Sequence, residues 1–304
     1  MPRSRGATLA GACIGLLLAL LPAQGRAATA DQATRPAAAR DGLMQVAGLR
    51  QWMSCAGSGP LTLVVIPGLG ASGRQWSTVL PALQGLTRTC IYDRPGLGHS
   101  PARANSAHAT DAGAQAAELH ALLIAAGEPG PYAVLGHSYG GLIARAFVRQ
   151  HLDETAALML LEAVDPSATG GSVWHEAGQA VDMRRSRAAA RGGPGLGQRP
   201  LVVLSASAAS GDHLPDPSAP FGRLVMTDWL RDQRASTRLS GNALWVVAHS
   251  GHVVQQDNPR ATVQAVRELL ASAADGSRLH CTAVWSGVDA RCEPAVEPRR
   301  SGTG

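Results

Sequence analysis

The chain has 304 residues, of which 45% are hydrophobic and 16% charged, so it is long enough to bury a core and its composition is neither disordered nor fibrous. All 27 basic residues are arginine, which excludes a phosphate-loop lysine and a lysine Schiff base to a cofactor. Without the three arginines in the segment 1–30, 24 basic residues face 22 acidic ones, which gives no electrostatic case for a nucleic-acid partner.

The N-terminal segment 1–30 has the layout of a cleaved secretory signal. A basic start is followed by the apolar run 12–21 and then by small residues. A membrane anchor is the alternative, but the run is shorter than the about 20 residues of a bilayer span. We therefore predict a signal peptide over 1–30, a flexible lead over 31–43, and a secreted or periplasmic protein with no stable membrane span. Four cysteines remain after Cys13 is removed, so disulfides are expected.

Apolar segments of strand length alternate with helix-like segments between residues 44 and 274. The expected strands cover 44–57 (a hairpin or two short strands), 61–68, 87–93, 132–136, 156–164, 200–206 and 242–248, and the expected helices cover 111–126, 141–151 and 259–274. This alternation predicts an α/β fold with a mostly parallel sheet covered by helices on both faces. Residues 165–199 break the alternation and suit a small mobile cap. Residues 275–304 form a C-terminal extension with the last two cysteines.

The stretch "VLGHSYGG" (134–141) contains the pattern G-x-S-x-G around Ser138. An apolar strand ends before this pattern and an apolar helix begins after it, so the serine lies on a sharp strand-turn-helix bend. Such a bend has room only for glycine two residues before and after the serine, and Gly136 and Gly140 supply that room. The setting favours a nucleophilic Ser138 over a serine that only caps a helix.

The base that activates Ser138 is expected from a distant loop. His137 is adjacent to the serine, and neighbouring side chains on a tight turn point apart, whereas a proton acceptor must come within about 2.6–3.2 Å of the hydroxyl. In "VVAHSGHVVQQDNP", His249 and His252 lie between a strand and a helix at the same sheet edge. We predict His252 as the base, because the preceding Ser-Gly pair lets it swing over the edge, and a structural role for His249.

Backbone amides are expected to stabilise the oxyanion that forms when the serine attacks a carbonyl carbon. Tyr139 offers its N–H at the start of the following helix. The loop "PGLG" (67–70) supplies the second donor, for which Leu69 is the first choice and Gly70 the reserve. Loss of one such donor typically lowers the rate by about 10² to 10³.

These motifs resemble those of the alpha/beta-hydrolase fold family, in its serine-nucleophile, esterase- or lipase-like branch. "GHSYGG" is similar to the nucleophile elbow, "IPGLG" to the oxyanion loop with Pro67 in place of the usual histidine, and "SGHVV" to the histidine loop. The resemblance covers about residues 44–274 and implies an eight-stranded sheet whose first strands follow the order 1-2-4-3-5. In that order Cys55 and Cys90 meet, which implies one disulfide between them and a second between Cys281 and Cys292.

The acid that orients the histidine is ambiguous in the sequence. The family most often places it after the strand 200–206, where the loop offers Asp212 and Asp216; a minority arrangement places it after the strand 156–164, at Glu162 or Asp165. A carboxylate at the end of a buried apolar run is costly without a partner, so we favour Glu162, then Asp165, then Asp212. The alternative role of Glu162 is an ion pair with a cap arginine such as Arg184. For Asp93 in "YDRPG" we expect a loop-ordering role.

The predicted reaction is hydrolysis of a carboxylic ester, or a related acyl substrate, through an acyl-enzyme on Ser138. A serine nucleophile disfavours the dehalogenase and epoxide hydrolase chemistries of the family, which use an aspartate. No cofactor or metal is expected, since Asp212, His213 and Asp216 lack a ligand spacing typical of metals. Amidase, thioesterase, lactonase and carbon-carbon hydrolase activities are alternatives within the fold. A non-catalytic binding protein of the same fold is the alternative from another class. The cap arginines suit either a solvated helix face or an anionic substrate.

Overall fold

The computed structural model describes residues 38–46, 48–104, 108–168, 173–193, 195–207, 220–293 and 295–296. The chain divides into two units, residues 1–32 and 33–304, and every described residue belongs to the second unit. The predicted signal peptide therefore lies outside the described residues. Within the described part, no helix is both long enough and apolar enough to span a membrane.

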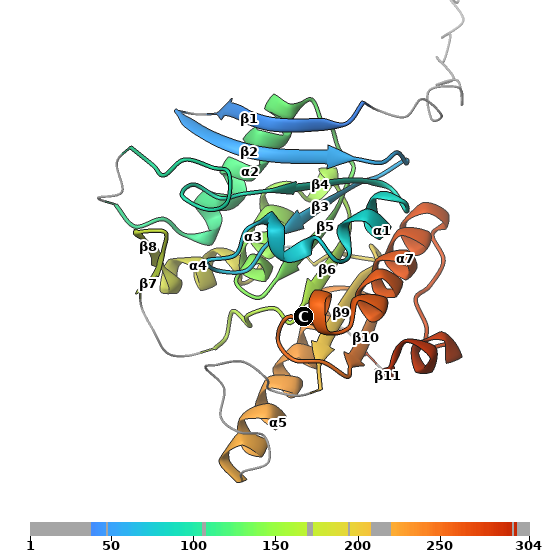
Figure 1. Cartoon of the computed structure of the whole chain (residues 1–304). Coiled ribbons are helices and arrows are strands. Elements are labelled where there is room, and N and C mark those ends of the chain that lie inside the picture. Colours follow the sequence, from blue (N-terminus) through green and yellow to red (C-terminus); the bar gives the residue numbers. More distant parts are fainter. Residues whose placement is uncertain are drawn as a thin grey trace, which may run out of the picture. The chain divides into compact units, whose positions relative to one another are not determined.

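A nine-stranded mixed sheet forms the centre of the described chain (Figure 1). Its strands are β1 (Arg40–Val46), β2 (Leu49–Ala56), β3 (Thr62–Ile66), β4 (Arg88–Tyr92), β5 (Tyr132–His137), β6 (Thr155–Leu161), β9 (Leu201–Ala206), β10 (Ala243–Ala248) and β11 (Ala290–Glu293). The order is β1-β2-β4-β3-β5-β6-β9-β10-β11, and the strands from β4 to β10 are parallel. Their continuous apolar sequences suit strands that are buried on both faces.

The edges of this sheet differ from the expectation. The predicted α/β fold and the hairpin near the N-terminus are confirmed, but β1 begins at Arg40, inside the segment expected to be a flexible lead. The C-terminal extension contributes β11, which pairs antiparallel with β10. The sheet therefore has nine strands instead of eight, because the extension covers an edge that would otherwise expose unpaired backbone groups.

Helices pack on both faces of the sheet (Figure 1). They are α1 (Leu80–Gln84), α2 (Ala112–Ala126), α3 (Gly140–Gln150), α4 (Met183–Ala190), α5 (Pro220–Ala235), α6 (Val254–Asp257) and α7 (Pro259–Asp275), with short 3₁₀ turns that include η4 (Ser236–Leu239). One apolar core joins α2, α3 and α4 to the sheet, with Leu119 and Phe147 fully buried. The other joins α1 and α7 to the opposite face, with Leu83 and Leu269 fully buried.

The cap region, residues 165–199, contains a hairpin and a helix. A two-stranded hairpin, β7 (Val173–Glu176) and β8 (Gln179–Asp182), precedes α4. The hairpin is attached to the body of the protein at Thr110, whose amide donates to Ala180 O at 2.9 Å and whose carbonyl accepts from Asp182 N at 2.8 Å. The hairpin is therefore held at a fixed place beside the sheet.

Two disulfides link the cysteines in the predicted pairs. Cys55 on β2 is directly opposite Cys90 on β4 in the antiparallel register. Cys281 and Cys292 close a loop of the C-terminal extension. The first bond therefore joins two neighbouring strands, and the second closes the loop that leads into β11.

Candidate active site

Ser138 lies at the turn between β5 and α3 with a backbone φ of 53°. Its amide donates to Leu161 O at 3.0 Å, which ties the turn to the end of β6. A Cβ atom on Gly136 would lie 2.4 Å from Gly140 O, and one on Gly140 would lie 2.3 Å from Ile66 O. The two glycines are therefore required by close backbone packing, and this packing holds Ser138 in the left-handed conformation that is strained for a non-glycine residue.

His252 is the residue that faces the Ser138 hydroxyl. Its Nε2 atom lies 3.0 Å from Ser138 Oγ, although the two residues are far apart in sequence. Burial lowers the pKa of His252, so the imidazole is neutral and able to accept a proton at pH 7. The loop is fixed by the amide of Gly251, which donates to the Asp257 carboxylate at 2.9 Å.

His137 lies behind Ser138 and contacts the loop that carries His252. Its Nε2 donates to the backbone carbonyl of His252 at 2.9 Å, and its ring packs edge-on against Trp76. Burial, together with the nearby His252, lowers the pKa of His137 to about 3. A histidine that stays neutral at all physiological pH values serves here as a fixed hydrogen-bond donor.

The loop after β3 packs directly against Ser138. A Cβ atom on Gly68 would lie 3.2 Å from Ser138 Cβ and 3.0 Å from His137 Nδ1, so the backbone must approach closely here. The amide of Gly70, the reserve oxyanion donor, is occupied by Glu176 Oε1 at 2.7 Å. The amides of Leu69 and Tyr139 form no hydrogen bond with a described residue, which leaves them available for an oxyanion.

A buried ion pair holds this oxyanion loop in place. Arg94 lies after β4, and its guanidinium donates to the carbonyls of Pro67, at 2.7 Å, and Gly68. The same guanidinium forms a bidentate pair with Glu176 at the end of β7, with Nε–Oε2 and NH2–Oε1 distances of 2.8 and 2.6 Å. Glu176 in turn accepts the Gly70 amide. Sequence analysis missed this network, whose only signal is an arginine and a glutamate that lie far apart in the chain.

Two residues for which the sequence suggested structural roles lie away from the Ser138 hydroxyl. The Asp93 carboxylate accepts the amides of Gly73 and His99 at 2.7 and 2.8 Å, which is the loop-ordering role. His249 is exposed, and its Nδ1 lies 3.2 Å from Asp289. Neither residue touches the reacting atoms.

Glu162 follows β6 with a backbone φ of 47° and is buried. Its carboxylate accepts hydrogen bonds from Trp229 Nε1 on α5 and, at 3.2 Å, from the amide of Ala206 at the end of β9. Burial raises the pKa of Glu162 to about 7, although the two hydrogen bonds act to lower it. Among the described residues, the structure does not form a hydrogen bond between Glu162 and His252. The ion pair with Arg184 is also not formed, and Arg184 is exposed.

The other two acid candidates are not placed against His252 either. Asp165 is half-buried and accepts hydrogen bonds from the amide of Ser167, at 2.6 Å, and from its hydroxyl. Asp212 lies outside the described residues, as do His213 and Asp216. The structure therefore brings Ser138, His252, Tyr139 and the loop after β3 together, and it places none of the described acid candidates against His252.

One group of potential metal ligands lies outside this site. His120 Nε2 lies 3.0 Å from the Glu154 carboxylate, and the rings of His120 and His151 stack with centroids 3.7 Å apart. Stacked rings direct their nitrogen lone pairs along nearly parallel planes instead of toward one point. The arrangement is that of a hydrogen-bonded histidine pair contributed by α2 and the end of α3.

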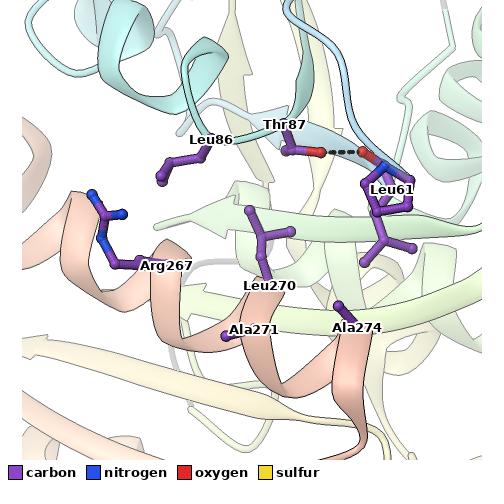
Figure 2. Close-up of a pocket in the computed structure, with 8 residues that line it drawn as sticks. Leu61, Leu86, Thr87, Arg267, Leu270, Ala271 and Ala274 are labelled. Atoms are coloured by element: carbon purple, nitrogen blue, oxygen red, sulfur yellow. Dashed lines mark hydrogen bonds between the residues drawn. The ribbon is translucent and has the colours of Figure 1, made fainter. Parts of the chain in front are cut away.

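An apolar hollow of about 240 Å³ lies at the opposite end of the sheet from Ser138 (Figure 2). It is formed by Leu61, which precedes β3, by Leu86 and Thr87, which precede β4, and by α7 residues such as Leu270. On the wall opposite α7, Thr87 Oγ1 donates to Leu61 O (Figure 2). Because Ser138 follows the carboxyl end of β5, this hollow belongs to the amino ends of the strands and not to the candidate active site.

Comparison with known proteins agrees with this fold. Residues 62–200 match the family model described as the alpha/beta hydrolase fold. Among curated relatives, RutD of Escherichia coli O44:H18 (strain 042 / EAEC), whose name refers to carbamate hydrolysis, is 36% identical over 103 residues. That alignment covers 34% of this chain and 36% of the relative, so the match spans about a third of that protein's length.

Solved structures resemble a larger share of the chain. A thermophilic esterase from Thermogutta terrifontis has a TM-score of 0.58 and 16% identity, and the match covers 77% of this chain and 99% of the esterase. A membrane phospholipase A described as a bacterial virulence factor has a TM-score of 0.57 and 19% identity over 78% of this chain and 87% of its own. At these identities the likeness concerns the fold. With the family match over residues 62–200 and the sheet order, it shows that the chain has the alpha/beta hydrolase fold.

Proposed function

We propose that the protein is a serine hydrolase that cleaves carboxylic esters through an acyl-enzyme intermediate. The observation that carries the proposal is the 3.0 Å contact between His252 Nε2 and Ser138 Oγ, at a strained elbow beside the amides of Leu69 and Tyr139. A neutral imidazole at this distance is able to take the hydroxyl proton as Ser138 attacks a carbonyl carbon.

The proposed reaction has two halves. Ser138 Oγ bonds to the acyl carbon while His252 takes its proton, and the amides of Leu69 and Tyr139 stabilise the oxyanion. His252 then gives the proton to the leaving alcohol. Water attacks the acyl-enzyme with His252 again as base, which releases the carboxylic acid and restores Ser138.

Glu162 is our first proposal for the acid that orients His252. In favour of it, Glu162 is a buried carboxylate that follows the strand next to the elbow, and its backbone φ is positive like that of Ser138. Strained backbone of this kind clusters at active sites. To act as the acid, the Glu162 carboxylate gives up its hydrogen bond from Trp229 Nε1 and accepts one from His252 Nδ1 instead. Asp165 and Asp212 are the successors if this proposal fails.

Export from the cytoplasm is a further part of the proposal. Two disulfides are rare in a chain that stays in a reducing compartment, and the segment 1–30 has the pattern of a secretory signal. N-terminal sequencing of the protein recovered from the periplasm or the culture medium tests this directly; a mature protein that retains Met1 in the cytoplasm contradicts it.

The test of the activity is a panel of p-nitrophenyl acetate, butyrate and octanoate, with matched amide and carbamate substrates because a relative is named for carbamate hydrolysis. We expect burst release from at least one ester, abolished in Ser138→Ala and lowered about 10³-fold or more in His252→Ala. If the carbamate or the amide is turned over faster than the esters, the substrate class is revised and the acyl-enzyme mechanism on Ser138 is retained. No turnover and no fluorophosphonate labelling of Ser138 indicates a non-catalytic binding protein.

A further inference from the structure

A second pocket, of about 440 Å³, lies beside α3 and is separate from the Ser138 site. Its walls come from α3, from the loop after β6, from the C-terminal end of α4 with the glycine-rich loop that follows, and from η4 with the end of α5. The residues that decide its chemistry are Arg145, Arg191, Arg238, Ser236 and Asp165. Among the described lining residues there are three arginines and one carboxylate, so this part of the pocket carries excess positive charge.

Arg145 is the central group, because it is a buried cation with one hydrogen-bond partner in the described chain. The residue is 8% exposed, and its NH2 atom donates to Ser236 Oγ at 2.6 Å. Its Nε atom has no hydrogen-bond acceptor among the described residues. Burial lowers the pKa of Arg145 to about 10, against an opposing effect of Asp165, so the guanidinium remains charged at pH 7.

No described carboxylate forms an ion pair with Arg145. Asp165 also lines the pocket, but its carboxylate accepts hydrogen bonds from Ser167. Buried arginines are almost always paired, because removing a lone charge from water is costly. Within the part of the chain that the structure describes, this buried cation therefore opens on a pocket without a paired anion, and the pocket has room for one.

Two arginines at the pocket rim add to its positive charge. Arg191 is exposed, and its Nε donates to Pro166 O at 2.6 Å, which holds the guanidinium at the wall. Arg238 on η4 is exposed on the other side. Planar guanidinium groups bind carboxylates and phosphates in a bidentate manner. Gly192, Gly193 and Gly195 also line the pocket.

We propose that this pocket binds the oxyanion group, a carboxylate or a phosphate, of a small molecule. Arg145 and the Ser236 hydroxyl contact the group inside, and Arg191 and Arg238 cover it at the rim. The site is distinct from the ester site, because none of its described lining residues belongs to the elbow, the oxyanion loop or the histidine loop. The pocket is larger than inorganic phosphate requires, so the ligand carries a further organic part.

Thermal unfolding and calorimetry with inorganic phosphate, sulfate and citrate, each against sodium chloride at equal ionic strength, test the proposal on the whole mature protein. We expect a saturable rise in Tm of about 3 °C at ten times Kd for the preferred anion. Comparison of phosphate with citrate distinguishes the two oxyanion chemistries. No rise beyond that with sodium chloride, for any of the three anions, overturns the proposal.

Variants then locate the site. Arg191→Gln and Arg238→Gln change exposed side chains and so keep the fold, and each is expected to weaken binding about tenfold. Arg145→Gln is expected to abolish binding and, because it removes a buried charge that lacks a carboxylate, to leave the ligand-free protein at least as stable. Arg231→Gln, on the exposed face of α5 with an ion pair to Asp228, is the charge-matched control. Equal anion binding in all four variants places the anion elsewhere and overturns the proposal.

Discussion

The guanidinium of Arg94 and the carboxylate of Glu176 form a bidentate pair that is almost fully buried, with side-chain exposures of 1% and 3%. The arginine belongs to the loop after β4 and the glutamate to the cap hairpin. Between them they bind the carbonyls of Pro67 and Gly68 and the amide of Gly70. The orientation of the Leu69 amide, the proposed oxyanion donor, is therefore set by a contact between the cap and the body.

Glu176→Gln is expected to lower kcat by about 10 to 100-fold and to change KM little, since it shifts the oxyanion donor without removing a group that binds substrate. It also leaves Arg94 as an unpaired buried charge, which costs about 3 kcal/mol of stability. Steady-state kinetics and denaturant unfolding measure both effects. Glu154→Gln, which removes a half-exposed glutamate far from the loop, is the control and should leave kcat unchanged. An unaltered kcat in a destabilised Glu176→Gln variant limits the pair to a structural role.

Glu162→Gln is expected to be more stable than the parent protein at pH 8. Burial raises the pKa of Glu162 from 4.5 to about 7, so the folded state binds this proton more tightly than the unfolded state does. The stability contributed by this group is present below pH 4.5 and is lost as the pH rises through about 7. The neutral amide of the variant does not ionise, so its free energy of unfolding at pH 8 is expected to exceed that of the parent protein by roughly 1 to 3 kcal/mol. Unfolding curves at pH 5 and 8 measure the difference, and a gap that does not grow with pH contradicts the shift.

The same variant tests the proposed acid. If Glu162 orients His252 during the reaction, Glu162→Gln lowers kcat by about 10³ to 10⁴, in a protein that is folded and stabilised. We expect this loss. Asp165→Asn and Asp212→Asn serve as matched carboxylate-to-amide changes, and near-normal turnover of Glu162→Gln together with a loss in one of them transfers the role.

Activity is expected to rise with pH through an ionisation below 6.5, because burial lowers the pKa of His252 from that value and only the neutral imidazole accepts the serine proton. The profile of kcat/KM between pH 4.5 and 8 gives the midpoint. His249→Gln changes an exposed histidine on the same loop and should leave the profile in place. A midpoint that moves in this variant contradicts the assignment of the ionisation to His252.

Much of this architecture follows from local patterns in the chain. Continuous apolar strands and amphipathic helices predict a parallel sheet, and the glycines around Ser138 predict the elbow because any Cβ there meets backbone. The histidine on the last strand-to-helix loop is predictable since the carboxyl ends of parallel strands share one edge.

Other parts depend on contacts that no short stretch of sequence encodes. The β7–β8 hairpin consists of two strands that are too short for a periodicity, and β11 is visible only through its pairing with β10. The Arg94–Glu176 pair joins two segments that carry no distinctive pattern. The partner of Glu162 was predicted as an arginine or His252, whereas the structure supplies the indole of Trp229 from α5, a helix that sequence analysis did not anticipate.

The attachment of the oxyanion loop to the cap hairpin constrains how such an enzyme diversifies. A cap that only shielded the site could be exchanged to alter substrate choice while the catalytic body stayed fixed. Here Glu176 belongs to the cap but binds Arg94 and the Gly70 amide of the body. A chimaera that replaces the hairpin must therefore place a carboxylate at the same position. Selection for new substrates is therefore free to reshape the cap on either side of the hairpin turn, but not at the glutamate itself.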